Sequence, residues 1–179
     1  MAAGLATLAG REAVRVARLS QALGGGAGLL VALWIATAAS SAFAGWLGAG
    51  LGQQLPGAGK TMFVAIALAL GAAELVVLRA GRTPREPTRS FGAILVVLLA
   101  AQLTDAARFL ILALAGASTA WWLVAAGGAI GAGIALTAAW AMEDEWEKRL
   151  PLGALRWSAA SLMLLAAVFI ALTARGLLG

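Results

Sequence analysis

The sequence has no cysteine and no histidine among its 179 residues. These absences exclude disulfide bonds, thiolate or imidazole metal ligands, and Cys or His nucleophilic catalysis. A divalent cation would depend on carboxylate, carbonyl and amide oxygens, the ligands that Mg, Ca and Mn prefer. The sequence also lacks a glycine-rich phosphate loop after a strand and a Ser/Lys or paired-aspartate arrangement at membrane depth. We therefore expect no enzymatic activity.

Charged residues are scarce as well. They make up 12% of the chain, against 62% hydrophobic residues, whereas soluble domains carry about a quarter charged residues. The composition therefore predicts an integral membrane protein that resides in the lipid bilayer. In so apolar a chain, the net charge of +5 indicates arginines at the cytoplasmic membrane surface rather than binding of nucleic acid.

Long apolar runs predict the membrane-spanning helices. Four segments have the length and composition of spans: residues 28–50, 61–78, 121–142 and 157–174. A fifth, residues 91–117, is long enough but is interrupted by the polar stretch 102–108, QLTDAAR. The first twenty residues are weaker, because a short apolar lead runs into Arg11 and Glu12. They could form a short, tilted first span or an amphipathic helix at the interface, and an internal repeat favours the span.

The chain repeats its pattern after 95 residues, the separation of Pro56 from Pro151. This shift lays span 28–50 on residues 123–145, span 61–78 on residues 156–173, and the polar residues 10–13 on residues 105–108. The pattern predicts two copies of a three-helix unit, and an odd number of spans per copy makes the copies antiparallel. We therefore expect an all-α polytopic membrane helix bundle of about six segments. Its parts would be a first repeat in residues 1–78, a basic linker in residues 79–90 and a second repeat in residues 91–179.

Charge placement orients this bundle. If linker 79–90, with four arginines and one glutamate, lies in the cytoplasm, ten of the thirteen basic residues fall on that side. The exceptions are Lys60 and Arg175 outside and Arg108 within the membrane. Tryptophans would mark the outer interface (46, 121 and 122) and the inner one (140, 146 and 157). Organelle-targeting features are absent, so we expect a multi-pass protein of the bacterial inner (plasma) membrane with its basic loops in the cytoplasm.

Glycine pairs four residues apart are candidates for close helix contacts, because small residues let helix backbones approach each other. The pairs are Gly48 and Gly52, Gly127 and Gly131, and Gly24 and Gly28. A chain rich in glycine and alanine also produces such pairs by chance, so both explanations stay open.

The polar stretch 102–108 needs a compensating partner or a function, since a charge at mid-membrane costs about 2.5–3.5 kcal/mol. Asp105 and Arg108 lie three residues apart and could pair on a helix, with Gln102 and Thr104 forming hydrogen bonds between helices. Alternatively, Asp105 faces a cavity as a transport site. We expect Glu74 to be an anchor near the membrane interface, within reach of Arg79.

The layout of two antiparallel three-helix copies joined by a basic linker resembles the Gdt-type family of small cation/proton exchangers. Members of this family carry Glu-φ-Gly-Asp-(Lys/Arg)-(Ser/Thr) in the first span of each copy. Residues 102–115 stand at the second motif, where Leu103 and Asp105 match while Gln102 and Thr104 replace Glu and Gly. Residues 8–19 stand at the first motif, where only Gly10 matches. The motif is therefore degenerate in both copies.

The resemblance implies a cation site made of acidic residues from both copies. Its candidate metal ligands here are Asp105, Gln102, Thr104 and Glu12, the last as a displaced second carboxylate. Arg108 and Arg11 would lie in the same charge network and would repel a cation. This set is thin for a hard divalent ion, which prefers six or more oxygen ligands.

The function implied by the resemblance is secondary transport of a divalent cation, Mn or Ca, in exchange for protons. The alternative is a transport-inactive membrane scaffold or regulatory paralogue of the same fold. We expect no tightly bound cofactor, only Mn, Ca or protons as transported species. A homodimer remains an open possibility.

Overall fold

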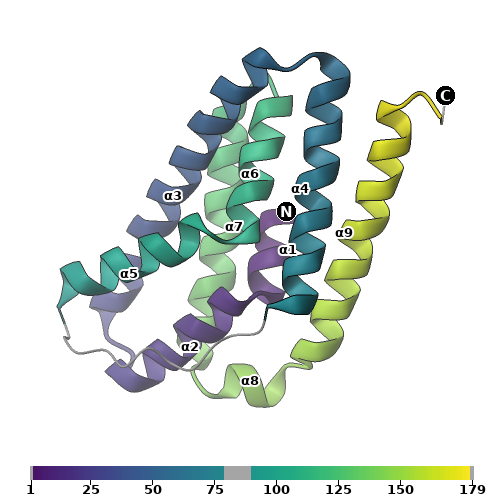
Figure 1. The fold of residues 1–179 in the computed structure, drawn as a ribbon. Helices are drawn as coiled ribbons and strands as arrows, with labels where there is room; N and C mark the ends of the chain where they lie inside the picture. The colour runs from purple at the N-terminus through teal and green to yellow at the C-terminus, as the bar shows by residue number, and fades with distance from the viewer. Residues whose placement is uncertain (1, 79–89, 178–179) are drawn as a thin grey trace.

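The computed structural model of the chain describes residues 2–78 and 90–177, and within them all regular structure is helical (Figure 1). Four helices are long and apolar enough to cross a membrane, and a fifth span results if one bent helix pair is counted as a single span. The chain is thus an all-helical bundle with four to five apolar helices, compatible with a multi-pass membrane protein. The expected linker at 79–90 lies outside the described residues except for Ser90.

The four long helices match the four predicted spans. They are α3 (Ala27–Gln54), α4 (Gly57–Val77), α7 (Trp121–Met142) and α9 (Leu152–Ala174). Of the most apolar stretch of α3, 44% is buried inside the bundle, against 17% for α9. Helix α9 packs mainly against α4 and leaves most of its surface exposed.

The predicted fifth span is broken at its polar stretch. Helices α5 (Phe91–Leu103) and α6 (Ala106–Ala117) meet at 60°, with Thr104 and Asp105 between them. Short polar side chains compete with helical hydrogen bonds and favour helix ends, and Asp105 has extended backbone angles (φ −92°, ψ 146°) as the residue before α6. The sequence predicted the interruption but not the bend, which sends α5 obliquely across the bundle (Figure 1).

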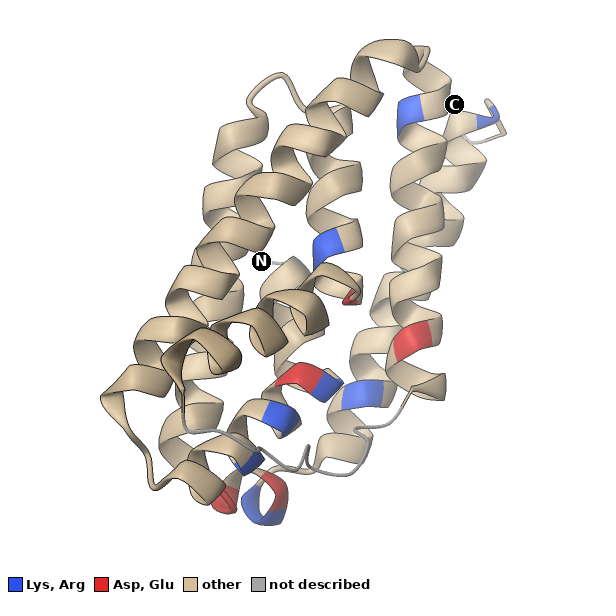
Figure 2. Cartoon of the chain, turned by 60° about the vertical axis from the view of Figure 1, so that its left-hand side comes forward, with Lys and Arg blue, Asp and Glu red and all other residues tan. Residues whose placement is uncertain are grey.

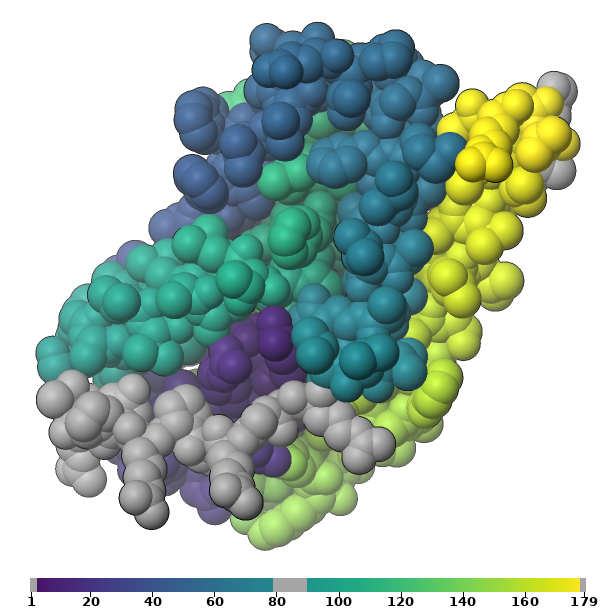
Figure 3. Space-filling model, in the orientation of Figure 1, coloured from purple at the N-terminus to yellow at the C-terminus, as the bar shows by residue number. Residues whose placement is uncertain are grey.

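The first segment forms two short helices, α1 (Ala2–Ala9) and α2 (Arg11–Leu23), joined at Gly10. Helix α1 has eight residues, a length of about 12 Å, and packs against α6 and α7. Figure 3 shows α1 lying between α4 and the α5–α6 pair. Helix α2 buries Val14 and Ala17 and packs on α7. Neither helix is long enough to span a membrane alone, so the expected sixth span is not confirmed.

Both members of the pair Gly48 and Gly52, and Gly131 of a second pair, contribute to close helix contacts, whereas Gly127 has nothing within 4 Å of a new Cβ atom. A side chain at Gly48 or Gly52 of α3 would overlap the carbonyl groups of Leu112 or Gly116 on α6. A Cβ atom on Gly4 of α1 would lie 3.0 Å from the carbonyl oxygen of Gly131 on α7. These backbone approaches confirm the interpretation of small residues as helix contacts. Gly24 has another role, because it ends α2 in the left-handed conformation at φ 75°.

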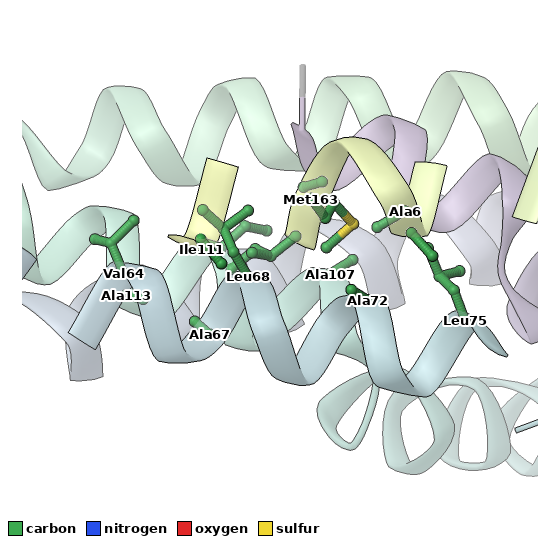
Figure 4. Close-up of a cluster of buried hydrophobic side chains, with 14 of the residues drawn as sticks. Ala6, Val64, Ala67, Leu68, Ala72, Leu75, Ala107, Ile111, Ala113 and Met163 are labelled. Atoms are coloured by element: carbon green, nitrogen blue, oxygen red, sulfur yellow. The ribbon is translucent and has the colours of Figure 1, made fainter. Parts of the chain in front are cut away.

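The core is built largely from alanine and branched aliphatic residues. Figure 4 shows Leu68 and Leu75 of α4 pointing toward Met163 of α9 and Ala6 of α1. A second cluster surrounds α2, and it includes Trp146 of the short helix α8 (Glu145–Arg149) at 2% exposure. The expectation that Trp146 faces the interface is therefore wrong: it packs inside the bundle. By contrast, Trp46, Trp122 and Trp157 are all exposed, as interfacial tryptophans would be.

Charged residues gather at one end of the bundle, as Figure 2 shows. We call this the charged end, and it is formed by α2, α8, the last turn of α4 and the first turns of α9. The described charged residues there are Arg11, Glu12, Arg15, Arg18, Glu74, Glu143, Asp144, Glu145, Glu147, Lys148, Arg149 and Arg156. Lys60 in the first turn of α4 and Arg175 after α9 lie at the opposite end.

Candidate functional site

Asp105 lies at the break between α5 and α6, where its side chain is 4% exposed. Its backbone carbonyl accepts the hydrogen bond from Arg108 N at 3.0 Å that starts α6. Asp105, Glu74 of α4 and Arg11 of α2 line one small cavity together with apolar residues of α1. The cavity measures about 10 Å³, room for no more than one water molecule. The break thus holds a carboxylate inside the bundle next to a second carboxylate from another helix.

Glu74 is the site residue that the sequence reasoning missed. It forms an ion pair with Arg11, with 3.1 Å between Glu74 Oε1 and Arg11 Nε, and the two side chains are 16% and 22% exposed. We expected an interfacial anchor near Arg79, a residue outside the described ranges. Glu74 instead lies between Arg11 and Asp105 around the cavity. One signal could have found it, since Glu74 is the only charged residue in the apolar segment 61–78.

Arg11 joins two helices at the site. Besides its pair with Glu74, it donates from Nη2 to the backbone carbonyl oxygen of Thr104 at 3.2 Å. That carbonyl belongs to the residue that ends α5, where a cation complements the negative end of the helix dipole. Arg11 therefore connects α2 with the end of α5 and with α4.

Arg108 and Gln102 belong to a separate buried network against α3. Arg108 donates from Nη2 to Gln102 Oε1 at 2.5 Å and from Nε to Ser40 Oγ at 2.9 Å. Gln102 Nε2 donates to Thr37 Oγ1 at 3.2 Å, and Ser40 Oγ donates to Gln102 Oε1 at 3.0 Å. All four side chains are at most 3% exposed. The bend at Asp105 turns Arg108 toward α3, so its nitrogen donors go to neutral groups rather than to the predicted partner Asp105.

The two other proposed ligands point elsewhere. Thr104 is exposed, and its hydroxyl donates to the carbonyl oxygen of Ala101 at 3.1 Å in its own helix. Glu12 is 1% exposed and accepts from Arg15 Nη1 at 2.6 Å, while its Oε2 has no hydrogen-bond partner among the described residues. Of the four proposed metal ligands, only Asp105 lines the small cavity. Within residues 2–78 and 90–177, no group of three or more Asp, Glu, His or Cys residues is placed to hold a metal ion.

The charges around the break balance one another. Three carboxylates, Glu12, Glu74 and Asp105, face three guanidinium groups from Arg11, Arg15 and Arg108. Buried charges persist only when such partners offset their desolvation. The arrangement can hold or release a proton at a carboxylate, whereas a divalent cation would require one of these arginines to move.

Comparison with known proteins adds no relative: no family model matches the chain, no curated protein matches its sequence, and no solved structure matches its fold. The resemblance to Gdt-type exchangers therefore remains an expectation from the sequence.

Proposed function

We propose that the protein is an integral membrane secondary transporter that exchanges a divalent cation, Mn or Ca, for protons, with Asp105 as the exchanging carboxylate. The observation that carries the proposal is the position of Asp105, buried at the break of a bent helix pair beside Glu74 and a small cavity. Broken helices inside a membrane bundle are a common way to build transport sites, and buried carboxylates there are commonly functional.

The helix boundaries support an inverted repeat as the framework of this transporter. A shift of 95 residues carries the start of α2 at Arg11 to the start of α6 at Ala106, and the start of α4 at Gly57 to the start of α9 at Leu152. It also carries Gly10, between α1 and α2, to Asp105, between α5 and α6. The packing of α3 on α6 then corresponds to that of α7 on α2. In this proposal the charged end faces the cytoplasm of a bacterial inner membrane.

Arg11 is the residue that would have to move during transport. Its guanidinium holds the Glu74 carboxylate and the Thr104 carbonyl, two oxygen groups that a hard cation would also use. Withdrawal of Arg11 would free both groups beside Asp105 in one step. Return of Arg11 would neutralise Glu74 again and expel the cation by like-charge repulsion.

The alternative function is a transport-inactive scaffold or regulatory paralogue of the same fold. Its support is the charge balance, three carboxylates against three guanidinium groups. In addition, no group of three or more acidic side chains among the described residues is placed to hold a metal ion. A closed network of this kind would stabilise the bundle without moving an ion.

Flux measurements separate the two functions. The protein is reconstituted in vesicles with a proton gradient. Mn, Ca and proton flux are measured for the wild type, for Asp105→Asn and for the control Glu145→Gln, at an exposed position of α8. The transporter proposal expects flux in the wild type and the control, and loss of flux in Asp105→Asn. No flux of any ion in the wild type would contradict transport and favour the scaffold. Flux that survives in Asp105→Asn would contradict the site assignment alone.

A further inference from the structure

A second cavity, of about 240 Å³, opens between α4 and α9 at the charged end. Its lining consists of Leu75, Val76, Gly153, Arg156 and Trp157. Trp157 is 64% exposed and Val76 is 38% exposed, so apolar side chains frame the mouth on the surface that faces outward from the bundle. Helix α9 is also the long helix with the least burial. The cavity therefore opens on the exposed apolar surface of α4 and α9, which would face lipid if the bundle spans a membrane.

Arg156 supplies the charge of this cavity. Its Nε donates to the backbone carbonyl oxygen of Ala9 at 3.1 Å, which holds the guanidinium in place. Within the described ranges, Arg156 forms no ion pair at 4 Å or less. Glu147 lies within electrostatic reach of Arg156, but its direct partner is Arg18, through two hydrogen bonds of 2.6 and 2.9 Å. Arg156 thus has no direct ionic partner among the described residues, and its guanidinium can pair with an anionic ligand.

The first turn of α9 adds to the positive character of the cavity. The helix starts at Leu152 after Pro151, and no side chain caps it. Gly153 in this turn has open space where a side chain would stand. The free amide groups of a helix start, with the positive end of its dipole, favour an anion. Gly153 of this turn and Arg156 both line the cavity, so positive charge and a helix start meet there beside the apolar side chains of Val76 and Trp157.

We propose that this cavity binds the phosphate of an anionic phospholipid, with Arg156 as the main contact and the acyl chains lying along α4 and α9. Basic pockets between membrane helices suit such headgroups, and the exposed Trp157 is of the residue type that prefers the headgroup layer. The volume lies below the usual range for drug-sized ligands, which fits a headgroup rather than a whole lipid. The apolar mouth favours a lipid over free phosphate. This site does not depend on the proposed transport function.

The test measures lipid binding to the full chain in detergent. Phosphatidylglycerol, phosphatidylcholine and inorganic phosphate are titrated separately, and bound lipid is counted by native mass spectrometry alongside the shift in the unfolding midpoint. The variants are Arg156→Gln, which removes the charge, and Gly153→Leu, which fills the cavity and keeps Arg156. The matched control is Arg175→Gln, an exposed arginine beyond the other end of the same helix.

We expect the wild type and Arg175→Gln to prefer phosphatidylglycerol, with binding weakened about fivefold in Arg156→Gln and to a similar degree in Gly153→Leu. Equal binding of the two lipids by the wild type would overturn the proposal. Equal losses in Arg175→Gln and Arg156→Gln would also overturn it, because they would reflect net charge rather than a site. Inorganic phosphate that binds as tightly as phosphatidylglycerol would overturn the assignment to lipid. If Arg156→Gln does not fold, unchanged lipid preference in Gly153→Leu contradicts the site.

Discussion

Arg108 donates a hydrogen bond to Gln102 across the break between α5 and α6, with 2.5 Å between Arg108 Nη2 and Gln102 Oε1. The contact spans the bend of 60° and is completed by hydroxyl groups of α3. It holds the two halves of the broken helix in one orientation.

Replacing Gln102 with alanine will destabilise the bundle, because it leaves a buried guanidinium short of an acceptor. We expect a loss of about 1–3 kcal/mol in the free energy of unfolding. Gln102→Glu keeps an acceptor oxygen in place and adds a charge opposite to that of Arg108. It will therefore lower the free energy of unfolding by less than Gln102→Ala does. Unfolding in detergent, followed by circular dichroism, measures both. Equal losses in the two variants would show that the contact contributes little.

The contact of α3 with α6 gives the second prediction. Gly52→Ala places a methyl group into the backbone of Gly116, which forces the helices apart and will cost about 1–3 kcal/mol. Gly50→Ala is the matched control, because Gly50 lies in the same helix with nothing within 4 Å of a new Cβ atom. The control should be stabilised by about 0.5–1 kcal/mol, since glycine weakens a helix. If the unfolding midpoints of both variants shift in the same direction relative to the wild type, the close packing at Gly52 is contradicted.

The third prediction concerns the pair of Arg11 and Glu74. A double-mutant cycle with Arg11→Gln and Glu74→Gln should give a coupling energy of about 0.5–1 kcal/mol, modest because both side chains retain some exposure. A double-mutant cycle between Arg11 and the exposed Glu145 serves as the control and should give no coupling energy. The cycle is calculated from the free energies of unfolding, in detergent, of the wild type, the two single variants and the double variant. A coupling energy of zero for Arg11 and Glu74 would show that their ion pair does not stabilise the site.

The sequence was informative about the helices and less so about their contacts. Apolar runs predicted all four long helices, and the polar stretch 102–108 predicted the interruption of the fifth, because hydropathy and helix breaking are local properties. Glu74 was misplaced because its partner Arg11 lies 63 residues away in the chain, and only the tertiary fold brings α2 beside α4. Trp146 was misplaced for the same reason, since its burial depends on how α8 packs against α2 and α7.

The roles of Thr37 and Ser40 were equally hidden. Two hydroxyl groups three residues apart in an apolar span usually bond to their own helix, and nothing local shows that they face Gln102 and Arg108. The expected pair of Asp105 and Arg108 assumed a continuous helix, in which residues three apart share a face. The bend removed that condition. Contacts across a break are therefore the part of this fold that local patterns do not determine.

The last prediction is a pH dependence outside the spanning helices. Arg18 of α2 donates two hydrogen bonds to Glu147 of α8, and this bonding holds the pKa of the Glu147 carboxyl below its usual range. A carboxyl whose pKa is lower in the folded state adds stability above its unfolded pKa, about 4.3, and this stability is lost as the pH falls through the folded value.

Glu147→Gln should therefore reduce stability at pH 7 by up to about 1 kcal/mol, a small effect because both side chains are about one-third exposed. The difference between the wild type and Glu147→Gln should shrink as the pH falls below 4.3, since protonation removes the ionic contact from the wild type as well. Unfolding midpoints measured at pH 7 and along an acid series test this. A difference that stays constant with pH would mean that Glu147 contributes through packing rather than through its charge, and α8 would then be held on α2 by the buried Trp146 instead.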